Sequence, residues 1–228
     1  MTPSILSKID EAIENERPIK IRAYAVLKGT EEGLNQITEK ILTKYDRQDL
    51  QGPVYTAIKE LAMNGAKANI KRLLFEEKKI DMDDESEYEE GMDIFKSHLN
   101  EEWVLDYARK CKLADLYVDL VFIYNEKRLI MEAINNRPLS TKEDERIRQK
   151  FKKSMGYDNI AEFYMEGGDS SEGAGMGIVL VTMMLKAQGM DPHLFTIRSN
   201  YKDSTIAKVE FPFSEMYVPS RMRYSYGK

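Results

Sequence analysis

The feature that most constrains this chain is a long helix, predicted from Pro53 to about Phe75, that is apolar over most of its circumference. Pro53 suits its first turn, where the missing N–H has no helical partner to lose. The apolar side is formed by Val54, Ala57, Ile58, Leu61, Ala62 and Ala68. Four polar residues interrupt this pattern at steps of four, three and four: Glu60, Asn64, Lys67 and Lys71. At about 100° per residue, they share a stripe roughly 60° wide on one face.

This polar stripe combines the groups that a metal–phosphate site needs. The amide oxygen of Asn64 can ligate a hard cation such as Mg²⁺. The carboxylate of Glu60, one turn earlier, can orient or deprotonate a nucleophile, and the amine of Lys67 can neutralise phosphate charge. An ordinary solvated helix face has similar patterns and is the alternative interpretation.

A second motif is the glycine-rich loop that precedes an apolar helix predicted at 178–188 and closed by Gly189. Its glycines alternate at Gly173, Gly175 and Gly177. Glycine allows close backbone approach, and the free N–H groups at a helix start bind phosphate. No Gly-Lys-Ser/Thr follows, so the loop is not a P-loop. A flexible lid or turn is the alternative.

Together the two motifs resemble the ATPase domain shared by sensor histidine kinases, anti-sigma-factor kinases, the gyrase B subunit and MutL, the GHKL family. The N box of that family, E-L-x-x-N-x-x-K, is matched at Glu60–Lys67, and its last glycine box at Gly173–Ile178. The resemblance covers about residues 20–213. It implies an α+β fold: a two-layer α/β sandwich of the Bergerat type, with a mixed, mostly antiparallel sheet and helices on one face.

The resemblance also implies ATP and Mg²⁺ as cofactors. Asn64 would hold Mg²⁺ against the phosphates, Lys67 would face phosphate, and Glu60 matches the general base of hydrolysing members. Thr205, at the start of the last strand, would support the adenine. The backbone around three glycines would wrap the phosphates: Gly173, Gly175 and Gly177.

The adenine-binding motif of the family, D-x-G-x-G, is altered here. Asn135 replaces the aspartate, and Arg137 and Leu139 replace the two glycines. The amide oxygen of Asn135 can still accept a hydrogen bond from the adenine amino group, without the strength that a charge adds. Arg137 could close the base pocket or stack on a base, and the sequence leaves both open.

The domain organisation follows from the predicted elements. Besides the helices already named, we predict helices at 2–15, 31–45, 91–111 and 141–153, and strands at 20–27, 116–124, 128–134, 194–199 and 205–213. The charged stretch 76–90 is predicted to be an exposed loop. We expect an N-terminal helix (1–19), an ATPase-type domain (20–213) with a helical insert at about 76–115, and a C-terminal tail (214–228). Trp103 is expected in the core of the insert.

Two functions are consistent with these motifs. No histidine precedes Glu60, and His98 is expected to be an ordinary surface or satisfied histidine, which disfavours autophosphorylation. The layout is closest to stand-alone anti-sigma-factor kinases, which implies an ATP- and Mg²⁺-binding regulator that phosphorylates or sequesters a protein partner. The alternative is a degenerate interaction module that kept the fold and lost productive use of ATP, as Asn135, Arg137 and Leu139 suggest.

Composition narrows the partners and the compartment. A net charge of -5 gives no reason to expect nucleic-acid binding, and no apolar run approaches the ~20 residues of a membrane helix. The one cysteine, Cys111, cannot form an internal disulfide, and the N-terminal residues lack a signal-peptide pattern, so we expect a cytoplasmic protein. A protein partner is expected. The tail, with Tyr217, Tyr224 and Tyr226, could dock that partner or complete the sheet of a homodimer mate.

Overall fold

The computed structural model describes residues 2–157, 160–165 and 176–223. It is an α+β fold around a five-stranded sheet with the order β1-β2-β3-β5-β4. The strands are β1 (Ile19–Ala23), β2 (Val118–Asn125), β3 (Arg128–Asn135), β4 (Phe195–Ser199) and β5 (Thr205–Pro212). All four pairings of these strands are antiparallel, so the expectation of a mixed sheet was wrong. The expected hairpins account for two of these pairings, because β2–β3 and β4–β5 are each joined by short turns.

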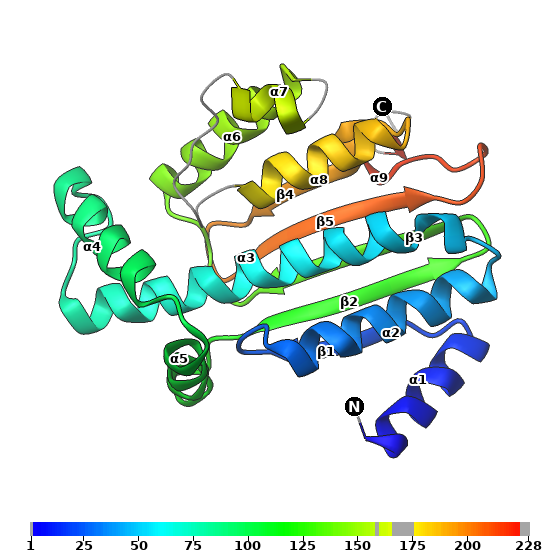
Figure 1. Ribbon diagram of the computed structural model, residues 1–228, viewed down its shortest axis with the longest axis horizontal. Coiled ribbons are helices and arrows are strands. Elements are labelled where there is room, and N and C mark those ends of the chain that lie inside the picture. Colours follow the sequence, from blue (N-terminus) through cyan, green and yellow to red (C-terminus); the bar gives the residue numbers. More distant parts are fainter. Residues whose placement is uncertain (1, 158–159, 166–175, 224–228) are drawn as a thin grey trace.

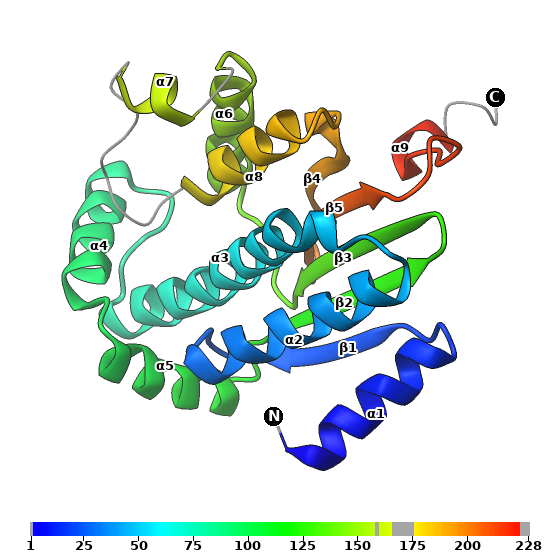
Figure 2. The same cartoon turned by 45° about the vertical axis from the view of Figure 1, so that its right-hand side comes forward.

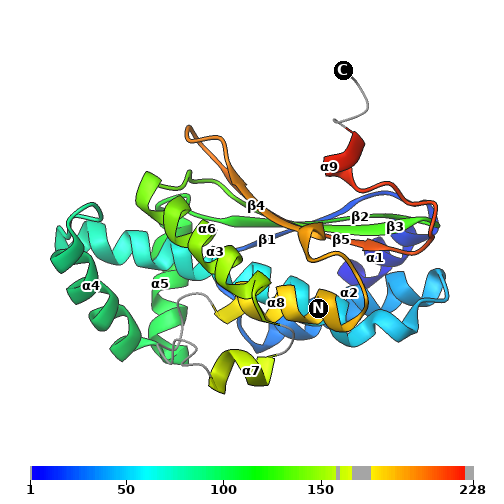
Figure 3. The same ribbon diagram turned by 90° about the horizontal axis from the view of Figure 1, so that it is seen from above.

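Helices of varied length pack mostly on one face of the sheet. In chain order they are α1 (Pro3–Glu14), α2 (Lys28–Lys44), α3 (Gln51–Lys78), α4 (Glu85–His98), α5 (Glu101–Leu113), α6 (Thr141–Met155), α7 (Ile160–Met165), α8 (Met176–Ala187) and α9 (Ser220–Arg223), with short 3₁₀ turns η1 (Gln48–Leu50) and η2 (Pro192–Leu194). Helices α2, α3 and α8 cover one face of the sheet, and α9 lies on the other (Figure 3). The predicted one-sided helical layer is therefore present.

Helix α3 is the central element of the helical layer. It lies between α2 and α8 and extends past the ends of the strands towards α4 (Figures 1 and 2). Its apolar side is buried, with Val54, Ala57 and Ile58 fully covered. Gly65 brings the helix very close to the sheet, because a Cβ there would lie 2.9 Å from a methyl group of Val118. The packing that the apolar pattern predicts holds the polar stripe in a fixed position beside the sheet.

The insert contains two helices, α4 and α5, over a second hydrophobic cluster. This cluster is centred on Phe75, Phe95, Tyr107 and Cys111. The predicted exposed loop at 76–90 was partly wrong: the stretch is largely exposed, but only residues 79–84 lie outside helices, because 76–78 continue α3 and α4 starts at Glu85. The side chain of Asp84 accepts a hydrogen bond from the N–H of Glu87 and caps α4, and Asn100 caps α5 through the N–H of Trp103. The high charge of the stretch belongs to the exposed side of a capped helix.

The C-terminal tail packs against its own sheet through Tyr217 and Ser220. Tyr217 is buried, and its hydroxyl donates to the carboxylate of Glu210 on β5. The N–H of Ser220 donates to the same carboxylate at 3.0 Å. Tyr217 is therefore not part of an exposed docking surface, while Tyr224 and Tyr226 lie outside the described residues.

Candidate functional site

The first turn of α8 meets the polar stripe of α3 at Gly177. An ideal Cβ on Gly177 would lie 2.5 Å from Oε2 of Glu60 and 2.6 Å from Nδ2 of Asn64. A Cβ at these distances would displace the ends of both side chains, so the lack of a side chain on Gly177 lets Glu60 and Asn64 lie against the first turn of α8. The structure thus brings together Glu60, Asn64 and the end of the glycine motif. Gly173 and Gly175, which the sequence also indicated, lie outside the described residues.

The rest of the stripe lines a cleft between α3, α4, α6 and α8, which we call the cationic cleft. It has a volume of ≈ 190 Å³. Its polar lining comprises Asn64, Lys67, Lys71, Tyr88, Glu143, Arg146 and Lys150, and its apolar lining includes Met92, Phe95, Leu139, Ile147, Ile178 and Ile197. The stripe is half-buried rather than a solvated face. Several cations collected over an apolar floor suit an anionic ligand.

A smaller pocket of ≈ 100 Å³ adjoins the cationic cleft on the sheet side of α3. The two share Asn64, Ala68 and Leu139 in their linings. Asn135 enters the small pocket from the end of β3, is only 6% exposed, and donates through Nδ2 to the carbonyl of Gly65 at 3.1 Å. Its Oδ1 is buried, and nothing in the described chain donates to it. A buried acceptor without a partner is costly, so this pocket suits a ligand with a hydrogen-bond donor.

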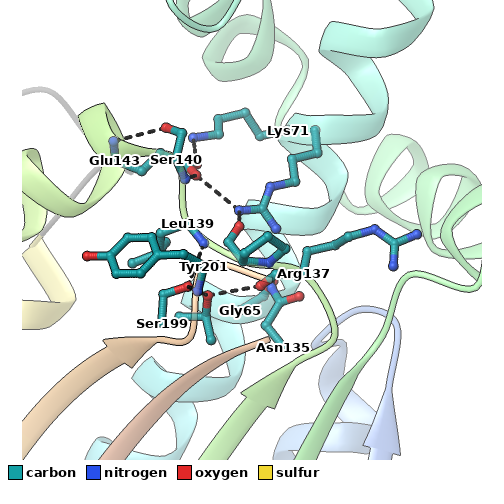
Figure 4. A network of polar contacts seen from close by, with 12 residues as sticks. Gly65, Lys71, Asn135, Arg137, Leu139, Ser140, Glu143, Ser199 and Tyr201 are labelled. Atoms are coloured by element: carbon teal, nitrogen blue, oxygen red, sulfur yellow. Dashed lines mark hydrogen bonds and ion pairs between the residues drawn. The ribbon is translucent and has the colours of Figure 1, made fainter. Parts of the chain in front are cut away.

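The segment after β3 is held by polar contacts from β4 and β5 (Figure 4). The hydroxyl of Thr205 donates to the carbonyl of Arg137 at 2.9 Å, and the N–H of Leu139 donates to Oγ of Ser199 at 3.0 Å. Thr205, the first residue of β5, also lines the small pocket. The guanidinium of Arg137 donates to the carbonyl of Asn136, and the described residues that line the pocket do not include Arg137. Leu139 does line it.

Sequence reasoning missed the buried ion cluster that joins α3 to α6. Glu143 is 7% exposed and accepts from Nζ of Lys71 at 2.8 Å and from Nη2 of Arg72 at 3.0 Å (Figure 4). Burial alone would raise the pKa of Glu143, but the charges of Lys71 and Arg72 outweigh it and lower that pKa to about 2. The sequence signal was Ser140-x-x-Glu143, a capping box that starts α6. The cluster fixes α6 as one wall of the cationic cleft.

Glu60 occupies an environment that favours its neutral form. Burial raises the pKa of its carboxyl above the ordinary value, against smaller opposite effects of Lys67 and Lys59. A carboxylate with a raised pKa is a better proton acceptor than an exposed one.

The described residues offer no group of three or more histidine, cysteine or acidic side chains that could hold a metal ion by themselves. A cation bound at Asn64 would take its remaining ligands from an anionic ligand or water, which is how Mg²⁺ is commonly held with phosphates. The amide of Asn64 and the cations of the cleft fit such a pairing.

Two residues singled out in the insert have structural roles. Trp103 packs against Tyr107 with ring centroids 4.2 Å apart and against Phe95, which confirms its place in the core of the insert. His98 is exposed, and its Nδ1 lies 2.8 Å from the carbonyl of Ile94. His98 is thus a satisfied surface histidine, as predicted.

Comparisons with known proteins give one informative match. The chain is 30% identical over 205 residues to an uncharacterized protein of Treponema pallidum (strain Nichols); the match covers 90% of this chain and 40% of that protein. No family model and no solved structure matches the chain. The helices of the described ranges are all too short or too polar to cross a bilayer.

Proposed function

We propose that this chain is an ATP- and Mg²⁺-binding regulatory protein whose fold is of the histidine-kinase-like (GHKL) type. The observation that supports this most is the approach of Gly177 to Glu60 and Asn64. These residues belong to the two motifs that carry the resemblance, and they are 113 or more positions apart in sequence. An unrelated surface helix and an unrelated glycine turn would have no reason to meet at those atoms.

The chain's residues divide the ligand between the two cavities. Asn135 Oδ1 accepts from the amino group of the base in the small pocket, beside Thr205. Lys67 neutralises phosphate in the cationic cleft, and the amide of Asn64 supplies an oxygen ligand to Mg²⁺. The ion screens the phosphate charge when bound.

Glu60 serves as the base in this proposal. Its carboxylate would accept the proton of the attacking hydroxyl, from water or from a protein partner, as that oxygen bonds to the γ-phosphorus of ATP and the bond to the departing ADP breaks. A protein partner is proposed because of the resemblance to stand-alone anti-sigma-factor kinases. A cytoplasmic location is proposed together with it. Loss of turnover with retained nucleotide binding in Glu60→Ala is the expected result. Turnover that persists in that variant contradicts the role.

The test of nucleotide binding is the melting temperature of the protein with ATP, ADP and GTP, each with and without Mg²⁺. A ligand that binds only the folded state raises the melting temperature. At a hundredfold excess over Kd it adds about 2.7 kcal/mol to the free energy of unfolding. Lys67→Gln should reduce the rise. Lys78→Gln is the matched control, because it removes the same charge from an exposed position at the end of the same helix.

The second candidate function is a partner-binding module without productive ATP use. Leu139 favours it, because this side chain lines both cavities where the family has glycine. If millimolar nucleotide leaves the melting temperature unchanged, with or without Mg²⁺, the result would favour the partner-binding module over the ATP-binding protein.

A further inference from the structure

The helical insert forms a wall of the cationic cleft. Tyr88, Met92 and Phe95 of α4 all line it. Three contacts join α4 and the turn before it to α6. Arg146 lies 3.1 Å from Glu85 and stacks on the ring of Tyr88 at 3.7 Å, and Nζ of Lys142 donates to the carbonyl of Asp83. The insert is therefore built into the site rather than appended to it.

Arg146 is held in the cleft by these contacts with part of its hydrogen-bonding capacity unused. Nη2 bonds to the carboxylate of Glu85. Nη1 is buried, and no acceptor for it lies in the described chain. Stacking on Tyr88 at 3.7 Å fixes the plane of the guanidinium, and a planar guanidinium with a free N–H is well suited to bind phosphate. A buried donor without a partner is costly unless a ligand supplies the acceptor.

The charge of the cleft indicates what that acceptor is. Arg146 shares the lining with Lys67, Lys71 and Lys150. Glu143 is the one carboxylate among the described lining residues, and both its oxygens already accept from Lys71 and Arg72. The charged side chains of this lining are thus mostly cationic, which favours an anionic ligand beside Arg146.

We infer that Arg146 contacts the phosphate groups of the bound nucleotide and that Tyr88 of the insert positions it there. The inference rests on the proposed nucleotide binding. It gives the insert a role in ligand recognition: the aromatic ring of α4 orients an arginine of α6 towards the anion. Tyr88 is a positioning residue, since it acts through Arg146.

The test compares Kd values from isothermal titration calorimetry for Mg·ATP with the melting-temperature shift caused by millimolar adenosine, which has no phosphate. Arg146→Gln should weaken Mg·ATP by roughly tenfold or more, as loss of a hydrogen bond between charged groups does, and leave the adenosine shift unchanged. Tyr88→Leu keeps every charge and should raise the Kd for Mg·ATP by roughly two- to fivefold. Lys152→Gln, an exposed position on α6, is the control and should change neither value.

The outcomes separate this inference from the proposed function. Wild-type protein that binds no nucleotide rejects the proposed function and the inference with it. If the wild type binds Mg·ATP and Arg146→Gln binds it equally well, the inference is overturned and the proposed function stands. If a variant reduces the melting-temperature shift caused by adenosine as well as its affinity for Mg·ATP, the residue has a merely structural role, and the inference is also overturned. If Arg146→Gln does not fold, Tyr88→Leu decides by the same comparison.

Discussion

Nζ of Lys71 lies 2.8 Å from Oε1 of Glu143, a carboxylate that comes 72 positions later in the chain. This contact fastens the start of α6 to the middle of α3, next to both cavities. The pair is buried, with side-chain exposures of 12% and 9%, and Arg72 completes it from the same helix. The two cations and the carboxylate stabilise the fold only as a set, because each is costly to bury alone.

Glu143→Gln should lower the free energy of unfolding by about 3–5 kcal/mol, because it leaves Lys71 and Arg72 buried without their anion. Urea denaturation at neutral pH measures this. Glu145→Gln is the control, since Glu145 is exposed two positions further along the same helix, and a change within about 0.5 kcal/mol is expected there. Equal stability of the two variants would contradict the assigned role of the cluster.

The same cluster predicts a pH dependence. The pKa of Glu143 is lowered from 4.5 to about 2 in the folded protein, so its contribution is complete above the ordinary pKa. That contribution is lost as the pH falls through 4.5 towards 2, when the unfolded chain takes up the proton first. The difference in unfolding free energy between wild type and Glu143→Gln should therefore shrink between about pH 5 and pH 2. A difference that stays constant over this range would contradict the ion cluster.

Gly177→Ala should preserve the fold and impair the site. The new methyl group would overlap Oε2 of Glu60 and Nδ2 of Asn64, which are the ends of side chains that can rotate away. We expect the stabilisation by Mg·ATP to fall sharply while circular dichroism stays unchanged. Gly29→Ala in α2 is the matched control, because a Cβ there meets nothing within 4 Å. If both variants respond to Mg·ATP as wild type does, the meeting of Gly177, Glu60 and Asn64 has no part in binding.

Asn135→Asp restores the acidic residue of the resembled family, yet it should destabilise this protein. Nδ2 of Asn135 donates to the carbonyl of Gly65 at 3.1 Å, and a carboxylate there would face that carbonyl without a proton to share. A loss of about 1–3 kcal/mol is expected at neutral pH. Denaturation at about pH 7 and pH 4 tests this, and the loss should be smaller at the lower pH, where the carboxyl is partly protonated. An unchanged stability at both pH values would show that the contact with Gly65 contributes nothing.

Periodicity was sufficient to predict the elements that carry the site. The apolar side of α3, the β2–β3 hairpin and the pairing of β4 with β5 follow from local patterns, and the structure has them within a few residues. The polar stripe was visible because Glu60, Asn64 and Lys67 stand out on an apolar helix. The meeting with Gly177 could be expected only from the resemblance, since nothing local to either segment specifies it.

The role of the insert could not be predicted from the sequence. Charge density around Glu85 and Tyr88 suggested a loop, although Asp84 followed by Glu87 is a capping pattern. The contact between Tyr88 and Arg146 joins residues that are 58 positions apart and depends on how α4 folds back from the end of α3.

The Kd of ATP, measured by calorimetry with and without Mg²⁺ for wild type and Asn64→Ala, tests the proposed site most directly. We expect Mg²⁺ to strengthen ATP binding to the wild type, and we expect Asn64→Ala to lose this gain while it still binds ATP weakly through the base pocket. Wild-type protein that binds no ATP at millimolar concentration, or a gain from Mg²⁺ that is the same in Asn64→Ala, would contradict the proposed site.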